Sequence, residues 1–272
     1  MKITFIGGGN MAGALIAGLA GKLTAGADIH VVDPNPDALA RLAASYGVSG
    51  AQAIDHAVGA SDVIVLAVKP QQMREVAAAL RAHLAARAPL ILSIAAGIRG
   101  VDLSRWLGGY GAIVRSMPNT PALIGLGITG MVAMQGVAAQ QKKAADDIMK
   151  AVGATVWLDD EALIDPVTAV SGSGPAYVFY FIEAMQQAAL ELGLSEQQGK
   201  ELALATFVGA AQLAAQSSEP VSVLRERVTS KGGTTYAAIT SMEHSAVKQA
   251  IVTAIKAAAA RGRELGDEMG AG

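Results

Sequence analysis

A strand, a glycine-rich turn and a helix follow one another without a gap at the start of this chain. Ile3 to Ile6 has the apolar character of a buried strand, Gly7-x-Gly9-x-x-Ala12 follows it directly, and Met11 to Leu23 has the pattern of a helix. In this setting the spacing is typical of a turn that binds the pyrophosphate of a dinucleotide. The first glycine makes the tight turn, the second lets phosphates reach backbone amides, and the alanine permits close packing of helix on strand. The alternative is a glycine-rich turn without a ligand, which the following strand disfavours.

That following strand, Asp28 to Asp33, ends in a carboxylate and is followed by Pro34-Asn35-Pro36. In a Rossmann unit the residue at the position of Asp33 faces the adenine ribose. A carboxylate there accepts a hydrogen bond from the 2′-hydroxyl of NAD and repels the 2′-phosphate of NADP. Asp33 is also the kind of residue that forms a simple turn before proline. Asn35 can turn toward a phosphate, but no arginine lies within this turn, so physical arguments alone leave both cofactors open.

Strands and helices alternate through the first half of the chain. Beyond those already named, the pattern predicts strands at 62–68, 90–94, 111–115, 128–133 and 155–157, the last at a sheet edge, and helices at 37–46, 73–86, 102–107 and 138–152. Alternation with continuously apolar strands is typical of a parallel sheet covered by helices on both faces. We therefore expect an α/β fold in which residues 1–158 form a dinucleotide-binding domain with a Rossmann-type doubly wound sheet.

From about residue 158 the pattern becomes helical only. Helices are predicted from Pro175 to Leu192, from a capping box at Ser195 to Ala215, and from Ser245 to Glu268. Hydrophobic residues make up 52% of the chain and charged residues 16%, so an all-α domain of this kind has more apolar surface than it can bury alone. We expect residues 159–272 to form a dimerisation and substrate domain that interlocks with a second copy into a homodimer or a larger homo-oligomer. The aromatic group at 177–181 is expected in its core.

Composition excludes several classes of function. The net charge of −2 comes with scattered basic residues, which disfavours nucleic acid and anionic membranes as partners. The chain has no cysteine, and its four histidines share no metal-like spacing, so neither thiolate chemistry nor a metal centre is expected. The first strand begins at Lys2 and leaves no room for a signal peptide, and no apolar run reaches the length of a membrane span. We expect a soluble cytoplasmic protein with a small-molecule substrate.

A small polar loop, Val228 to Tyr236, opens directly into a helical run from Ala237 to Met242. Its two glycines let a backbone approach a ligand closely, and the first N–H groups of a helix point outward as donors for an anion. Ser230, Thr234 and Thr235 add hydroxyl groups that donate and accept. The pattern predicts a cradle for a small carboxylate, and the alternative is an ordinary helix start capped by serine or threonine.

Three further loops have a functional and a structural interpretation. Lys69 follows the strand at 62–68, beyond the carboxyl edge where a doubly wound sheet binds its ligand, and it is either a cofactor contact or a solvated charge. Ser116 to Pro121 has two prolines and either supports a nicotinamide or simply connects two elements. Val170 to Tyr177 is again a small polar loop before a helix, and it either forms part of a ligand site or allows two helices to cross closely.

A hydroxyl-rich, metal-free pocket beside a nicotinamide suits hydride transfer to a carbon that is already electrophilic, such as that of a protonated imine. Five segments together resemble one family, the pyrroline-5-carboxylate reductases: Ile6 to Met11, Leu66 to Gln71, Met117 to Pro121, Ser171 to Tyr177 and Thr229 to Thr235. The resemblance runs from the first strand to the last helix. It implies the final step of proline synthesis, in which NAD(P)H reduces 1-pyrroline-5-carboxylate to L-proline.

The resemblance also implies roles for individual residues. The amides from Gly232 through Gly233 and Thr234 to Thr235, beside Ser230, would hold the substrate carboxylate, the catalytic Thr235 hydroxyl would bind the ring nitrogen, and Glu161 would lie near the site entrance. The implied cofactor contacts are Ile6, Gly7, Gly8, Gly9, Asn10, Met11, Asp33, Asn35, Ala67, Val68, Lys69, Pro70, Ala96, Met117, Pro118 and Asn119. NADPH is the implied cofactor. Many relatives carry serine or an Asn-Arg pair at Asp33 to Asn35, which leaves NADH as a second cofactor, and Lys231 replaces a proline of several relatives.

Two other functions stay open at this point. A β-hydroxyacid dehydrogenase has the same order of domains, but it would be expected to use a lysine of the helical domain, and no lysine lies between Lys150 and Lys200. A dinucleotide-binding protein without catalytic activity is supported only by the rule that fold does not fix function.

Overall fold

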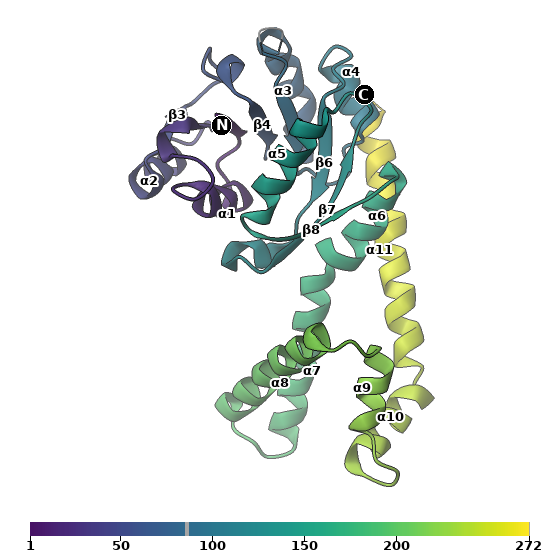
Figure 1. Ribbon diagram of the computed structural model, residues 1–272. Coiled ribbons are helices and arrows are strands. Elements are labelled where there is room, and N and C mark those ends of the chain that lie inside the picture. The colour runs from purple at the N-terminus through teal and green to yellow at the C-terminus, as the bar shows by residue number, and fades with distance from the viewer. Residues whose placement is uncertain (85–86, 272) are drawn as a thin grey trace. The chain divides into compact units, whose positions relative to one another are not determined.

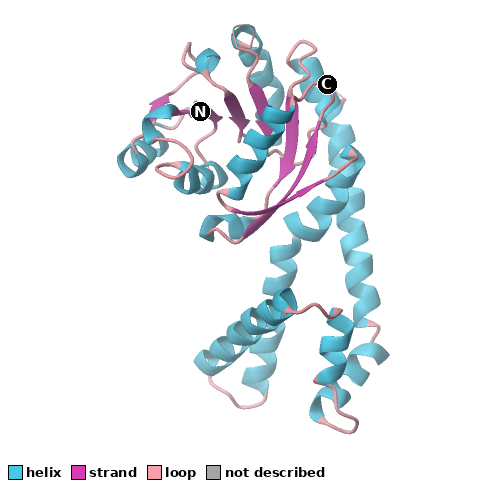
Figure 2. Cartoon of the chain, viewed as in Figure 1, coloured by secondary structure: helices cyan, strands magenta, loops and turns pink. Residues whose placement is uncertain are grey.

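The computed structural model describes residues 1–84 and 87–271 and forms two compact units. The first unit is Met1–Ser173 together with the chain from Ala257 onward, and the second is Gly174–Lys256. All the named strands lie in the first unit, and the named elements of the second unit are helices (Figures 1 and 2). Each unit is described by itself below.

One sheet of eight strands organises the first unit. Its strands are β1 Ile3–Ile6, β2 Ile29–Val32, β3 Ser49–Ala51, β4 Val63–Leu66, β5 Leu90–Ser93, β6 Ile113–Met117, β7 Gly127–Ala133 and β8 Gly153–Trp157. They lie in the order β3-β2-β1-β4-β5-β6-β7-β8. From β1, strands β2 and β3 are added toward one edge of the sheet and the later strands toward the other, as in a doubly wound fold. The seven strands predicted from the sequence lie within two residues of their expected bounds, and β8 is an edge strand as predicted.

The expectation of a fully parallel sheet is wrong for one pair of strands. β6 and β7 are antiparallel, whereas β8 is again parallel to β7. A parallel connection needs a crossover of a dozen residues or more, and only residues 118–126 join β6 to β7. The chain between β7 and β8 is longer and contains the helix α5 Ala139–Lys150, which makes their parallel crossover possible.

Helices cover both faces of the sheet and form two separate cores (Figure 1). On one face α1 Asn10–Leu19, α2 Pro36–Tyr46 and α5 pack apolar residues against β1, β2 and β4. On the other face α3 Met73–Leu80 and α4 Gly100–Trp106 pack against alternate residues of the same strands. Because consecutive strand residues point to opposite faces, continuous apolar strands supply both cores.

Two predicted helices are shorter than expected, and one strand was not predicted. The first helix ends at Leu19 rather than Leu23, since Gly21 follows with φ 75°, the left-handed conformation that glycine adopts readily. The helix predicted at 73–86 ends at Leu80 and is followed by a 3-10 turn, Arg81–His83, while residues 85 and 86 lie outside the described residues. β3 is a three-residue strand without an apolar pattern.

The second unit consists of helices: α7 Gly174–Glu191, α8 Glu196–Gln216, α9 Val221–Arg227, α10 Thr234–His244 and the first part of α11 Val247–Gly270. The predicted capping box is confirmed, because the Gln198 amide donates to the Ser195 hydroxyl at 3.2 Å and the Ser195 amide to the Gln198 side chain at 2.9 Å. Phe181 of α7 meets Phe207 of α8 with ring centres 6.2 Å apart. The short helix α9 was not predicted, and neither was the short helix α6 Ile164–Val167 of the first unit.

The last part of α11 belongs to the first unit. Asp267 pairs with Arg99 at 2.7 Å, the carbonyl of Gly270 accepts a hydrogen bond from Arg105 at 2.7 Å, and Met269 packs against the core that contains α3 and α4. Gly262 and Gly266 are buried there, which allows the helix to approach the sheet unit closely. The C-terminal turns are therefore part of the fold that begins at Met1.

The carboxylate of Asp146 in α5 holds the edge strand β8 in place. It accepts hydrogen bonds from the Thr155 hydroxyl at 2.7 Å and the Trp157 indole at 3.0 Å, and it pairs with Lys150 at 2.7 Å. Burial raises the pKa of Asp146, but the hydrogen bonds from Lys150, Thr155 and Trp157 and the charge of Lys150 together outweigh it and hold the pKa below its usual value. The ionised form is therefore the one that the fold stabilises.

Replacing Asp146 by asparagine is expected to lower the free energy of unfolding at neutral pH by about 1–2 kcal/mol, since an amide NH2 group replaces the oxygen that accepts from Lys150 and the negative charge is lost. A carboxyl whose pKa is lower in the folded state stabilises the fold above its unfolded pKa, about 3.9, and loses this effect as the pH falls. The difference between wild type and Asp146→Asn should therefore shrink below about pH 4, as thermal unfolding across pH will show. Asp147→Asn, which breaks only the exposed pair with Lys143, should change stability little. Equal effects of both variants would contradict the assignment.

Candidate active site

The turn between β1 and α1 uses its glycines in two different ways. Gly7 is buried with φ 103°, and a Cβ atom there would lie 2.6 Å from the carbonyl oxygen of Ala67, so the fold itself requires glycine. Gly9 is exposed, and a Cβ atom there would have no neighbour within 4 Å. Gly9 is also the N-cap of α1, and the first amides of this helix donate to no capping side chain among the described residues. These donors face open space, as an anion site at a helix start requires.

Asp33, directly after β2, is fixed by this turn. Its carboxylate accepts a hydrogen bond from the Gly8 amide at 2.7 Å with one oxygen and from the Asn35 amide at 2.8 Å with the other. The Asn35 side chain accepts from the Asp37 amide at 3.0 Å and so caps α2. Asp33 therefore has the turn-forming role, and each of its oxygens keeps a further lone pair for a ligand.

A cleft of about 550 Å³ lies at the carboxyl edge of β1, β2 and β4. The predicted cofactor residues that line it are Ile6, Gly7, Gly9, Asp33, Ala67, Val68 and Lys69. Sequence reasoning missed the rest of the lining. It comes from the end of β2 and the next residue, from the segment after β3, from the 3-10 turn before α3 and from one face of α3: Val32, Pro34, Gln52, Ala53, Ile54, Gln72, Glu75, Val76 and Ala79. The face of α3 was recognisable from its spacing, whereas the segment after β3 depends on a strand that the sequence pattern does not reveal.

The other predicted cofactor residues lie on neighbouring loops of the first unit. Asn10 lines a second, smaller hollow with Gly9 and residues of α2, Met11 lies in α1, Pro70 begins a 3-10 turn after Lys69, and Ala96 lies in the turn after β5. Because β1, β4, β5 and β6 are parallel to one another, the loops that follow them meet at the same edge of the sheet. Gly8 contacts Asp33 as described.

The loop from Met117 to Pro121 is joined to the Ser171 motif. The Asn119 amide group donates to the Ser171 carbonyl at 3.2 Å, and its oxygen accepts from the Ile128 amide at 3.0 Å. A Cβ atom on Gly172 would lie 2.6 Å from the methyl carbon of Met117, so this glycine permits a close crossing. The segment Thr168–Gly172 is a π-helical turn, a departure from regular helix that is frequent at functional sites. The two motifs are thus in direct contact, although Asn119 and Ser171 are 52 positions apart in sequence.

In the second unit, the loop before α10 has the geometry of an anion cradle. Gly232 has φ 76°, and Gly233 is the N-cap of α10, with its amide donating to the Ser230 carbonyl at 3.0 Å. No side chain in the described part of the chain caps α10, so the first amides of the helix, those of Thr234, Thr235 and Tyr236, keep their donors free of intrahelical and capping partners. An ordinary Ser/Thr-capped helix start is therefore not what the structure shows.

Comparison with known proteins gives the family. Residues 161–265 match the model "Pyrroline-5-carboxylate reductase dimerisation", and residues 2–97 match "NADP oxidoreductase coenzyme F420-dependent". The pyrroline-5-carboxylate reductase of Pseudomonas aeruginosa is 45% identical over 99% of this chain and 98% of its own length. The chain belongs to the pyrroline-5-carboxylate reductase family.

Solved structures of this family have the same fold over nearly their whole length. The reductase of Coxiella burnetii is 39% identical, with a TM-score of 0.91 over 97% of this chain and 98% of that one. The reductase of Plasmodium falciparum, solved with NADP bound, is 30% identical, with a TM-score of 0.87 over 98% of both chains. This agreement confirms the predicted fold class and the resemblance on which the site residues were assigned.

The cleft of this reductase family member fits a nicotinamide dinucleotide. The open space at Gly9 and the uncapped start of α1 suit a pyrophosphate, and Asp33 has lone pairs at the position that faces the adenine ribose. Lys69 lines the same cleft, so a positive charge is present there. Residues 2–97, which contain this cleft, are the residues that match the oxidoreductase model.

Glu161 of this reductase family member has a structural partner that sequence reasoning missed. Its carboxylate accepts hydrogen bonds from the Arg115 guanidinium at 2.5 Å and from the Gly100 amide at 2.6 Å. Arg115 is 4% exposed and the Glu161 side chain is 26% exposed, so this is a partly buried ion pair that joins β6, α4 and the turn Glu161–Leu163. A contact of Glu161 with the substrate stays a prediction.

Two further observations concern the described residues only. Their histidine and acidic side chains form no group of three or more that could hold a metal ion. Among the described helices, none combines the length and apolar character needed to cross a membrane.

Proposed function

We propose that this chain reduces 1-pyrroline-5-carboxylate to L-proline with a hydride from a reduced nicotinamide dinucleotide, the last step of proline biosynthesis. The observation that carries the proposal is the pairing, in one chain of this family, of a dinucleotide cleft with an uncapped helix start that suits a carboxylate. Pyrroline-5-carboxylate has one carboxylate and one C=N bond, and these two groups match the predicted amide cradle and hydroxyl.

The residues before and at the start of α10 would hold the substrate. The amides from Gly232 to Thr235 would bind its carboxylate, because the start of a helix carries unpaired donors and a partial positive charge. A Cβ atom on Gly233 would lie 2.9 Å from the Ser230 hydroxyl oxygen, so glycine keeps the hydroxyl and the amides close together. The substrate would then be oriented before any bond changes.

Thr235 would act on the reacting bond. Its hydroxyl, partly buried in the first turn of α10, would hydrogen-bond the ring nitrogen and orient the C=N group. When bound, the cofactor supplies the hydride that the imine carbon gains, and the nitrogen is either protonated beforehand or takes its proton from water. An imine becomes an amine with one hydride and one proton, and no general acid of unusual pKa is needed.

An assay of reduced-nicotinamide absorbance with 1-pyrroline-5-carboxylate tests the proposed function. Rapid loss of absorbance, with L-proline as the product, is the expected result. Binding of the dinucleotide without turnover would leave the cleft assignment standing and overturn the reaction. Turnover of 3-hydroxy acids instead would revive the β-hydroxyacid dehydrogenase alternative.

NADPH is proposed as the preferred cofactor, with NADH accepted. The Plasmodium falciparum relative was solved with NADP bound, which supports the first part. The negative charge of Asp33 repels the 2′-phosphate of NADPH. Both of its oxygens already accept hydrogen bonds from backbone amides, which compensate part of that charge. Asp33 would therefore narrow the preference for NADPH without reversing it.

Replacing Asp33 by asparagine should raise the ratio of kcat/KM for NADPH to kcat/KM for NADH by about threefold to tenfold, or roughly 0.7–1.4 kcal/mol. The amide keeps an oxygen acceptor for one backbone amide and removes the charge. Asp37→Asn, a similar change in the neighbouring helix outside the cleft lining, is the matched control and should leave the ratio unchanged. Initial rates with both cofactors measure the ratio, and an unchanged ratio in Asp33→Asn would contradict this role.

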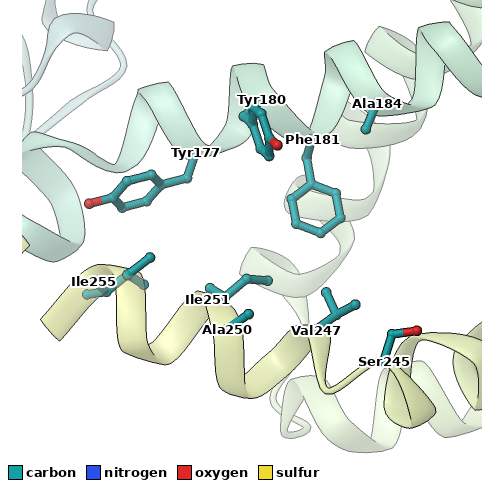
Figure 3. Close-up of a pocket in the computed structure, with 10 residues that line it drawn as sticks. Tyr177, Tyr180, Phe181, Ala184, Ser245, Val247, Ala250, Ile251 and Ile255 are labelled. Carbon is teal, nitrogen blue, oxygen red and sulfur yellow. The ribbon is translucent and has the colours of Figure 1, made fainter. Parts of the chain in front are cut away.

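An intertwined homodimer, assembled further in some conditions, is proposed as the working form. Among residues 174–256 only Gly199 and Ala203 are buried, whereas Tyr180 is 74% and Leu192 84% exposed. An apolar hollow of about 520 Å³ lies between α7 and α11. Tyr177, Tyr180 and Phe181 of α7 face α11 across it (Figure 3). The match of residues 161–265 with a dimerisation model supports a second copy as the cover of these faces. A monomeric mass by light scattering would contradict the proposal.

A further inference from the structure

A row of polar side chains crosses one face of the sheet beside the cofactor cleft. His30 in β2 is in register with Thr4 in β1 and with Ser49 in β3, so the three side chains lie on the same face. The Thr4 hydroxyl is 2.6 Å from the Ser61 hydroxyl. His30 is the only titratable member of this row, and the proposed reaction assigns it no role.

The His30 ring connects two elements that lie on either side of a short segment. Its Nδ1 atom is 2.9 Å from the Ser49 hydroxyl oxygen, at the start of β3. Its Nε2 atom is buried and has no hydrogen-bond partner among the described residues, and it faces the Asp55 carboxylate at an ion-pair distance of 3.5 Å. The His30 side chain is 13% exposed and the Asp55 side chain 34% exposed, so the contact is partly shielded from water. A proton on Nε2 is attracted to Asp55, which makes the ring a bridge between Ser49 and Asp55.

The residues between Ser49 and Asp55 form one wall of the cofactor cleft. Gln52, Ala53 and Ile54 line it together with Asp33 and Pro34. The segment is anchored at its start by the Asp33 amide, which donates to the Ala51 carbonyl at 3.1 Å, and at its end by Asp55, whose carboxylate accepts from the Ala57 amide at 2.9 Å. Since the end of β2 faces the adenine ribose in a Rossmann unit, this wall is on the adenosine side of the cleft.

We propose that His30 is a positioning residue for the dinucleotide. Through Ser49 and Asp55 it holds the wall Gln52–Ile54 in its binding conformation, so the cofactor does not have to order this wall when it binds. His30 itself lines no part of the cleft. The inference rests on the proposed function only for the identity of the cofactor, and it places the effect of His30 on dinucleotide affinity rather than on the chemical step.

Two substitutions of His30 separate the two contacts. In His30→Asn the side-chain amide reaches the place of Nδ1, which keeps the contact with Ser49, and in His30→Gln it reaches the place of Nε2, which keeps the contact with Asp55. Asp55→Asn removes the charge and keeps an oxygen for the Ala57 amide. The probes are NADPH and NADH, titrated into each full-length variant by fluorescence, with thermal unfolding as the check that each variant is folded.

The dissociation constant for either dinucleotide should rise about threefold to tenfold in His30→Asn and in Asp55→Asn. It should rise by less than about twofold in His30→Gln, because the Ser49 end of the segment is also held by the pairing of β3 with β2. With saturating cofactor, kcat and the KM for 1-pyrroline-5-carboxylate should stay at the wild-type values in all three. Wild-type affinity in both His30→Asn and Asp55→Asn would overturn the proposal, as would equal losses in His30→Gln and His30→Asn. If His30→Asn does not fold, Asp55→Asn decides. A wild-type protein that binds NADPH but does not turn over pyrroline-5-carboxylate would overturn the proposed function and leave this test intact.

Discussion

Thr235→Ala is expected to lower kcat/KM for 1-pyrroline-5-carboxylate by about ten- to a thousandfold. The hydroxyl is the group proposed to orient the ring nitrogen, and a preorganised hydrogen bond at a reacting atom contributes most in the transition state. Thr235 is in the first turn of α10 and partly exposed, so the substitution removes no buried core contact. Steady-state rates at saturating NADPH, with thermal unfolding of the same sample, measure the effect.

Two matched variants test whether the loss comes from the hydroxyl. Thr235→Ser keeps the oxygen and should stay within about threefold of wild type. Thr234→Ala removes the neighbouring, exposed hydroxyl but keeps the amide that is proposed to bind the carboxylate, so its effect should also be small. An alanine variant of Thr235 as active as wild type would exclude the catalytic assignment, and a serine variant as inactive as alanine would point to the methyl group instead.

Alanine substitutions at the two glycines of the first turn are expected to affect different properties, stability at Gly7 and cofactor binding at Gly9. Gly7→Ala should lower the free energy of unfolding by about 2–4 kcal/mol, because a Cβ atom meets the Ala67 carbonyl oxygen and φ is positive. This corresponds to a fall in Tm of roughly 5–15 °C. Gly9→Ala should change stability by about 1 kcal/mol or less, since its Cβ has open space, yet raise the dissociation constant for NADPH at least about tenfold. The methyl group would occupy the space that the pyrophosphate needs.

Gly13→Ala is the control within the same helix. A Cβ atom at Gly13 would have Leu42 as its nearest neighbour at 3.9 Å, an ordinary contact, so alanine should be tolerated and should favour the helix. Thermal unfolding and NADPH titration of the three variants give the full comparison. Normal NADPH affinity in Gly9→Ala would show that the phosphates do not approach this backbone.

The strands and the site loops could be predicted because each has a local cause. β1, β4 and β5 are buried on both faces and are apolar except for Thr4 and Ser93, and the glycine turn and the loop before α10 depend on residues adjacent in sequence. The orientation of β7 has a local cause as well, the short connection after Met117, and the length of that connection was the available signal.

Other parts of the site depend on contacts between distant residues. Arg115, inside a buried strand, needs an acidic partner, but only the fold shows that this partner is Glu161, 46 positions away. The wall Gln52–Ile54 follows a strand with no apolar pattern, so its place in the cleft follows from pairing with β2 alone. Sequence reasoning assigned Asp33 to the ribose and did not find its bonds to Gly8 and Asn35, because these require the turn to be built first.

The place of α11 has a consequence for how the protein folds as it is synthesised. The hydrogen bond from Arg105 to Gly270 joins residues 165 positions apart, and Met269 completes the core beside α3 and α4. At a synthesis rate of about 5–20 residues per second, residues 1–173 are made several seconds before the turns of α11 that contain Met269 and Gly270. The core that contains α3 and α4 therefore lacks Met269 during that time. Met269 can join this core only after residues 174–256, which belong to the second unit, have been made.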